Sequence, residues 1–260
     1  MHYTAIVLAA GKGKRMKSRI SKQFLELNGK PVLYYALTAF EKSSVNDIIL
    51  VTQEADIGYC RKEIVEKYGF QKVRRIVAGG RERYDSVWKG LQAAEHSDYV
   101  LIHDGARAFI DQETIERCMQ DVVKSRACVA AVPVKDTIKA VDSSLLGVET
   151  PDRSTLWTIQ TPQVFEQPLI YEAYRKLALE QEAGTAPSVT DDTMVAEHYT
   201  GIRSHIVMGS YYNIKVTTPE DLILGQAILD HEQLQAAQID NQGNVQKEAE
   251  KELKKNRKVN

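Results

Sequence analysis

Short apolar runs of strand length alternate with amphipathic segments through most of the chain, and this alternation restricts the fold more than any other feature. The apolar runs cover residues 5–8, 48–51, 99–102 and 128–132. Between them, residues 31–41 and 111–124 place apolar side chains at helical spacing. Strands that alternate with helices predict an α/β fold, with a mostly parallel sheet and helices on both faces. In such sheets, ligands bind beyond the carboxyl ends of the strands.

Residues 136–165 interrupt this rhythm. Residues 136–141 alternate in polarity as a strand does, a turn cluster follows at 142–144, and a short extended run returns at 147–149. We expect a protruding antiparallel β-arm, inserted in the α/β domain over about 136–165. Arms of this kind often exchange contacts within a dimer, although a simple surface hairpin fits the pattern nearly as well.

A composition change marks the end of the expected domain, which spans residues 1–231. Thr218 and Pro219 suit the N-cap and first position of a final helix. Over residues 232–260, Gln, Asn, Glu and Lys dominate. This segment is predicted to be a frayed helix or a disordered tail.

The charge balance excludes several classes of partner. The 260 residues include 34 Lys and Arg and 35 Asp and Glu, so the net charge is −1. This argues against a protein that works on nucleic acid or on an anionic membrane, but not against a local basic site. There is no apolar run near the roughly 18 residues of a membrane span. The three cysteines, Cys60, Cys118 and Cys128, lack disulfide-type or zinc-type spacing, so we expect a cytoplasmic protein.

A glycine-containing loop follows the first predicted strand. It comprises Ala9, Ala10, Gly11 and Gly13, and Arg15 and Lys22 come shortly afterwards. Small residues let the backbone approach a phosphate closely, and the two cations can neutralise its charge. The loop lacks the third glycine of a dinucleotide fingerprint and the Gly-Lys-Ser/Thr of a Walker A loop. A plain glycine turn with solvated basic residues remains the alternative.

A second glycine pair, Gly79 and Gly80, follows a predicted strand at 73–77 and precedes a helical segment at 85–94. Ser86 lies where it can cap that helix or offer its hydroxyl to a base, and local sequence favours capping.

The next strand ends on His103 and Asp104. A carboxylate at this position suits Mg²⁺ that bridges phosphates, although it can also cap the following turn. His103 has no nearby ligand partner, which favours a packed histidine.

Further polar residues stand in irregular segments, where binding residues concentrate. Arg153 and Thr161 lie around the expected arm, and Lys215 lies just before the last helix. The run 190–192 reads Thr-Asp-Asp. Each signal is weak alone, and for Lys215 the local sequence favours a simple exposed position.

Taken together, these motifs are similar to those of the 2-C-methyl-D-erythritol 4-phosphate cytidylyltransferases. The resemblance covers about residues 4–230, and its blocks follow one another in the family's order. They are residues 9–16, 79–87, 103–107, 132–139, 156–163, 190–192 and 213–217. The resemblance implies a three-layer, Rossmann-like fold of the nucleotide-diphospho-sugar transferase type. It also implies a homodimer formed through the β-arm.

The implied reaction transfers CMP from CTP to 2-C-methyl-D-erythritol 4-phosphate, a sugar-alcohol phosphate, in isoprenoid precursor biosynthesis. The sugar phosphate attacks the α-phosphorus in line, and pyrophosphate leaves. No covalent enzyme intermediate is implied, so catalysis consists of positioning and electrostatics. Mg²⁺ or another divalent cation is the implied cofactor.

The resemblance also implies roles for individual residues. The catalytic cations are Arg15, Lys22 and Lys215, and the metal ligand is Asp104. The substrate-binding residues fall into three groups. The phosphate loop comprises Ala9, Ala10, Gly11 and Gly13. Gly80 and Ser86 read the cytosine, and Arg107 supports their pocket. The sugar phosphate is held by Thr137, Arg153 and Thr161.

Two other functions remain open. Ribitol-5-phosphate cytidylyltransferases share the fold and the chemistry, but they tend to carry Ala-Gly-Gly at the loop entrance, where this chain has Ala9-Ala10-Gly11. A catalytically silent CTP-binding module is the second alternative. Such a module would usually have lost its phosphate-handling charges, whereas this chain keeps them.

Overall fold

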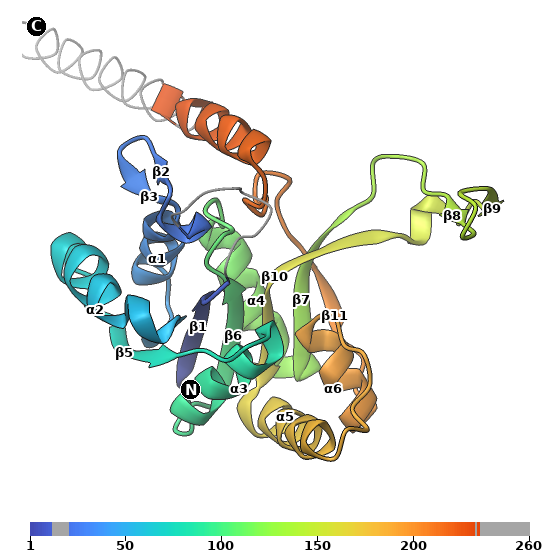
Figure 1. The fold of residues 1–260 in the computed structure, drawn as a ribbon, viewed down its shortest axis with the longest axis horizontal. Coiled ribbons are helices and arrows are strands. Elements are labelled where there is room, and N and C mark those ends of the chain that lie inside the picture. The colour runs from blue at the N-terminus through green and yellow to red at the C-terminus, as the bar shows by residue number, and fades with distance from the viewer. Residues whose placement is uncertain (12–20, 232, 235–260) are drawn as a thin grey trace, which may run out of the picture.

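A seven-stranded sheet forms the centre of the computed structural model, which describes residues 1–11, 21–231 and 233–234 (Figure 1). The strand order is β11-β7-β10-β6-β1-β4-β5, and β10 runs antiparallel to both its neighbours while the other pairs are parallel. The strands are β1 (Tyr3–Ala9), β4 (Asp47–Thr52), β5 (Val73–Ala78), β6 (Tyr99–Asp104), β7 (Ala127–Pro133), β10 (Trp157–Glu166) and β11 (His205–Met208).

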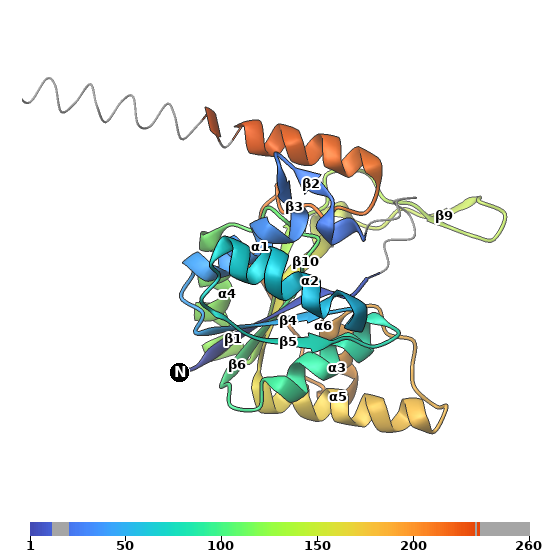
Figure 2. The ribbon, with the colours of Figure 1, turned by 60° about the vertical axis from the view of Figure 1, so that its left-hand side comes forward.

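Helices cover both faces of this sheet (Figure 2). One face carries α1 (Val32–Lys42), α4 (Gln112–Ser125) and a segment that starts as α2 (Ile57–Tyr59) and continues as a π-helical stretch (Cys60–Glu66). The other face carries α3 (Arg83–Ala93), α5 (Gln167–Glu182) and α6 (Asp192–Thr200). Side chains of β1 alternate between the two cores, with Val7 on the first face and Ile6 on the second. The predicted three-layer α/β fold is confirmed.

The arm protrudes from the strands β7 and β10 (Figure 1). Its tip is a small antiparallel pair, β8 (Ala140–Val141) and β9 (Gly147–Glu149). The predicted range of 136–165 extends too far, because Trp157 pairs with Pro133 and Phe165 pairs with Ala127 inside the central sheet. Residues 160–165 are buried between β6 and β7. The sequence pattern alone does not distinguish a buried strand of the sheet from the returning strand of an arm.

The last helix spans residues 219–231 and packs Ile228 and Leu229 against Leu27 and Phe109. It covers a small hairpin made of β2 (Glu26–Leu27) and β3 (Lys30–Pro31). The predicted tail, 232–260, lies outside the described residues except for 233 and 234.

The three cysteines are buried free thiols, as the sequence predicts. Within the described part of the chain, none of the helices combines the length and apolar character that crossing a membrane requires.

Candidate active site

A pocket of about 810 Å³ opens at the carboxyl ends of β1, β4, β5 and β6. This is where parallel α/β sheets bind their ligands. The pocket brings together residues that are far apart in the sequence, among them Ala9, Ala10, Gly11, Lys22, Gly80, Ser86, Asp104 and Lys215. Every one of these was singled out as a site residue from the sequence.

The loop after β1 forms one wall of this pocket, with Ala9, Ala10 and Gly11. The buried Gln23 side chain fixes the start of this loop, since its Nε2 donates to the carbonyl oxygen of Ala9 at 2.5 Å. Gly13 and Arg15, which were predicted to bind the phosphates, lie outside the described residues.

The glycine pair after β5 forms the opposite wall and leaves no room for side chains. A Cβ atom on Gly79 would lie 2.7 Å from the Cβ of Ala10, and one on Gly80 would lie 2.1 Å from the Cβ of Asp85. Glycine at position 79 therefore lets the two loops approach each other closely, and glycine at position 80 lets the turn lie against the first turn of α3.

Ser86 does not cap α3, contrary to the local expectation. The N-cap residue is Glu82, whose backbone N–H donates to Asp85 at 2.9 Å in a capping box. Ser86 lies one turn inside the helix, where its Oγ accepts from the N–H of Gly80 at 3.1 Å. The serine thus holds the glycine wall in place while it lines the pocket.

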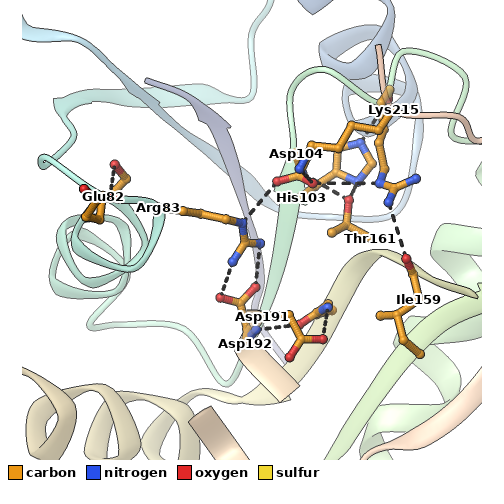
Figure 3. A network of polar contacts seen from close by, with 12 residues as sticks. Glu82, Arg83, His103, Asp104, Ile159, Thr161, Asp191, Asp192 and Lys215 are labelled. Carbon is orange, nitrogen blue, oxygen red and sulfur yellow. Dashed lines mark hydrogen bonds and ion pairs between the residues drawn. The ribbon is translucent and has the colours of Figure 1, made fainter. Parts of the chain in front are cut away.

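Asp104 ends β6 and is the most strongly engaged carboxylate of the pocket (Figure 3). Its Oδ2 lies 2.7 Å from Nζ of Lys215, and its Oδ1 lies 3.3 Å from Nε of Arg83. Burial alone would raise the pKa of Asp104, but the charges of Arg83 and Lys215 outweigh it and hold the pKa well below its usual value. The carboxylate is therefore ionised throughout the neutral range.

Lys22 also lines the pocket and contacts the segment that carries Lys215. Its Nζ donates to the carbonyl oxygen of Val216 at 3.1 Å, directly beside Lys215. The two lysines and Asp104 thus line one pocket, although the lysines are far apart in the sequence.

His103 and Thr161 form a buried support beneath Asp104 (Figure 3). Thr161 Oγ1 accepts from the N–H of Asp104 at 3.1 Å and lies 3.0 Å from Nδ1 of His103, whose Nε2 lies 3.1 Å from the carbonyl oxygen of Arg107. Burial lowers the pKa of His103 to about 4, so the ring is neutral at pH 7. His103 is a packed histidine, as its sequence context favours.

Thr161 and Arg107, which the resemblance implies at the site, use their polar groups inside the protein. Thr161 is 3% exposed and its hydroxyl is used inside the protein, which differs from the implied contact with sugar phosphate. Arg107 donates to the carbonyl oxygens of Asn213 at 2.8 Å and Ile159 at 3.4 Å. It therefore lies on the β10 side of Asp104 and not among the residues that line the pocket at Gly80.

Thr137 and Arg153 are exposed on the arm and do not line the pocket of their own chain. Arg153 donates to the carbonyl oxygen of Lys135 at 2.9 Å, which ties the two sides of the arm together. The structure does not bring these two residues to Lys22 and Asp104 within one chain.

Sequence reasoning missed Arg83, which lines the pocket and contacts Asp104. Its other partner is Asp192, at 2.8 Å and 109 residues away. The sequence around Arg83 does not predict a partner so far away. From its neighbours alone, Arg83 is an ordinary charged residue near the start of a helix.

These features define a class of protein. Short glycine-containing turns, two lysines and one buried carboxylate at the carboxyl edge of an α/β sheet are typical of an enzyme that handles the phosphates of a nucleotide. A family model described as 2-C-methyl-D-erythritol 4-phosphate cytidylyltransferase matches residues 3–231, and the chain belongs to this family. The resemblance inferred from the sequence motifs is thereby confirmed.

Relatives and solved structures agree with this assignment. The 2-C-methyl-D-erythritol 4-phosphate cytidylyltransferase of Lachnospira eligens is 54% identical over 84% of this chain and 95% of its own length. That of Lachnoclostridium phytofermentans is 50% identical over 88% of this chain and 97% of its own length. The crystal structure of 4-diphosphocytidyl-2C-methyl-D-erythritol synthase from Anaerococcus prevotii has a TM-score of 0.76 at 34% identity, covering 88% of this chain and 96% of that chain.

Proposed function

We propose that this chain transfers CMP from CTP to 2-C-methyl-D-erythritol 4-phosphate, a step of isoprenoid precursor biosynthesis, in the cytoplasm. The products are 4-diphosphocytidyl-2-C-methyl-D-erythritol and pyrophosphate. Convergence of Lys22, Lys215 and Asp104 on one pocket, in a member of this family, carries the conclusion.

The reaction forms one P–O bond and breaks another. An oxygen of the sugar phosphate attacks the α-phosphorus of CTP, and the bond from that phosphorus to the β-phosphate oxygen breaks as pyrophosphate leaves. Negative charge gathers on the α-phosphate during this exchange, so fixed cations accelerate it. Lys22 and Lys215 supply such cations at the pocket, and Arg15 is proposed to join them.

The two loops are proposed to bind the nucleotide. The backbone of Ala9, Ala10, Gly11 and Gly13 takes the phosphates, and Gly80 with Ser86 faces the cytosine. Both loops line the same pocket, which supports this.

A divalent cation, Mg²⁺ or a similar ion, belongs to the proposal. The donor set fits such an ion: Asp104 supplies one ionised hard oxygen ligand at the pocket wall, and Mg²⁺ usually takes one or two carboxylates together with substrate phosphates. Among the described residues there is no cluster of three or more acidic, histidine or cysteine side chains that would cage an ion by itself. Asp104 would hold the cation, and the bound ion would neutralise charge on the triphosphate oxygens.

The second substrate is proposed to meet the arm of a second copy of the chain. Thr137 and Arg153 would hold its phosphate, and Arg107 and Thr161 would order the floor beside Asp104. Exposed apolar side chains on the arm support a homodimer, since Leu145 is 82% exposed and Leu146, Val148 and Val141 are 66%, 65% and 50% exposed. Apolar surface gathered on a protruding segment is typical of an interface.

Pyrophosphate release tests the proposal and separates it from its rivals. Purified protein with Mg²⁺ is given each of the four nucleoside triphosphates and either methylerythritol phosphate or ribitol 5-phosphate. Fast release only with CTP and methylerythritol phosphate is the expected result. Faster reaction with ribitol 5-phosphate would indicate the ribitol enzyme, and CTP binding without release would indicate the silent module.

A further inference from the structure

The Thr-Asp-Asp motif at residues 190–192 has no part in the proposed reaction, yet its last residue is completely buried beneath the pocket. The Asp192 carboxylate accepts from both terminal nitrogens of Arg83, at 2.8 Å each, and from the hydroxyl of Tyr174 at 2.5 Å. Asp192 therefore serves Arg83 and does not face a ligand.

Arg83 connects this buried carboxylate to the pocket (Figure 3). Because Asp192 engages the two terminal nitrogens, the planar guanidinium can turn very little. Its Nε–H is then directed at Oδ1 of Asp104 at 3.3 Å. The other oxygen of Asp104 is left for Lys215, at 2.7 Å.

The residues around Asp192 are themselves fixed. Gln163 on β10 accepts at its Oε1 from the backbone N–H groups of Asp192 and Thr193, both at 2.9 Å. Its Nε2 donates to Asp191 at 3.0 Å, and Asp191 caps α6 through the N–H of Met194 at 2.9 Å. The start of α6 is thus held on the same strand that carries Thr161 beneath Asp104.

Two other roles for Arg83 fit the contacts less well. A direct phosphate ligand would present a paired edge of its guanidinium to the pocket, but Asp192 takes the edge formed by the two terminal nitrogens and Asp104 lies at Nε, so only single outer N–H groups remain. As a clamp between α3 and α6 alone, the Arg83–Asp192 pair would have no need of a contact with Asp104. Buried ion pairs also contribute little net stability relative to apolar packing, so stability is a weak reason for this chain of charges.

We propose that Arg83, held by Asp192, is a positioning residue that fixes the orientation of the Asp104 carboxylate in the pocket. This inference rests on the proposed function, because there Asp104 would hold the divalent cation beside the phosphates of CTP. Without Arg83, the carboxylate is free to turn toward Lys215 and Arg107, which already lie within 2.7 Å and 3.8 Å of its Oδ2.

Arg83→Lys and Asp192→Asn test the proposal together. A lysine keeps the charge but cannot contact Asp192 twice and Asp104 once, and the asparagine keeps the shape but loses the charge. We expect each variant to lower kcat about 10–100-fold, with the KM for CTP within about threefold of wild type, as for a lost interaction between charged groups. Arg126→Lys, at the more exposed ion pair with Glu166, is the matched control and should retain the wild-type kcat.

Two further readouts separate positioning from folding and from direct binding. Calorimetry without added metal should give a dissociation constant for CTP within about threefold of wild type for Arg83→Lys. In single-turnover assays with enzyme in excess, Arg83→Lys should lower the rate constant less than about twofold when Asp104 is already replaced by asparagine.

Three results would each overturn the inference. One is a wild-type kcat in both variants, and another is CTP binding that weakens as much as kcat falls. The third is a single-turnover rate that Arg83→Lys lowers equally with and without Asp104→Asn. Those outcomes leave the proposed function intact. Wild-type protein that transfers no CMP would instead overturn the proposed function itself.

Discussion

The pocket and the arm differ in the number of separate elements whose contacts fix their side chains. At the pocket, Asp104 is contacted by Arg83 from α3, by Lys215 from the segment before the last helix, and by Thr161 from β10. The arm consists mostly of exposed residues, joined by one small strand pair and a few local contacts, such as that of Arg153 with Lys135.

This difference teaches which part of the reaction one chain supports by itself. The residues proposed to bind the nucleotide are brought together within a single chain, at one edge of the sheet. The arm residues proposed to hold the sugar phosphate do not line this pocket, which is why we propose a second copy. The following experiments test that division, from the largest expected effect to the smallest.

Removing either pocket lysine should have the largest effect. Lys22→Ala or Lys215→Ala should lower kcat about 10²–10³-fold, because each removes one cation from the charge that develops at the α-phosphate. Lys124→Ala, an exposed lysine on α4, is the control and should leave kcat unchanged. Steady-state kinetics on variants with wild-type melting temperatures would measure this, and an unchanged kcat would remove that lysine from the mechanism.

The buried His103 makes the stability of the pocket floor depend on pH, and the arm has no equivalent group among its described residues. Its pKa is about 4 in the folded protein, against about 6.5 in an unfolded chain, so the folded state binds this proton less readily. The free energy of unfolding should therefore fall as the pH is lowered from about 6.5 to 4, by up to about 3 kcal/mol for this group.

Denaturant unfolding at a series of pH values checks this prediction. His103→Gln should show a shallower loss of stability over that range than the wild type. His96→Gln, at a side chain that is 85% exposed, should keep the wild-type slope. Equal slopes for all three proteins would show that His103 titrates normally.

Arg153 tests whether the arm serves a second chain. Arg153→Ala should raise the KM for the sugar phosphate about 10–100-fold, because one contact between charged groups is lost, and should leave the KM for CTP unchanged. Arg61→Ala, an exposed arginine far from the arm in sequence, is the control.

Mixing two defective variants sharpens this test. If the arm reaches the partner's pocket, a mixture of Arg153→Ala and Lys215→Ala chains should recover about a quarter of wild-type activity, since half of the dimers contain one intact site. No recovery after subunit exchange would mean that the arm serves its own chain.

Leu145 tests the proposed interface and should give the smallest effect. Leu145→Glu should raise the dimer dissociation constant about tenfold or more in sedimentation equilibrium, because burial of a leucine contributes about 1.5–3 kcal/mol. Leu179→Glu, at a residue on α5 that is 53% exposed, should leave association unchanged. Equal association of both variants would place the interface elsewhere.

The sequence predicted the strands and the pocket loops well, because apolar runs and glycine turns are local signals. Asp104 could be placed at the site since it ends a buried strand. Ser86 was harder, because Glu82 and Asp85 compete for the helix start and local sequence does not decide between them.

Long-range contacts were beyond the reach of local patterns. Arg83 pairs with Asp192 across 109 residues, and nothing near either residue indicates the other. Arg107 and Thr161 were expected at the substrates, but their hydrogen bonds to Asn213 and His103 depend on how β6, β10 and the 213–217 segment pack. The far end of the predicted arm joins the sheet for the same reason.

Phosphorus NMR of the complete reaction tests the proposed function most directly. With CTP, methylerythritol phosphate, Mg²⁺ and the wild-type chain, the triphosphate signals should disappear as pyrophosphate and a diphosphate diester appear in equal amounts. Unchanged CTP, or its hydrolysis to CMP without a diester, would contradict the account.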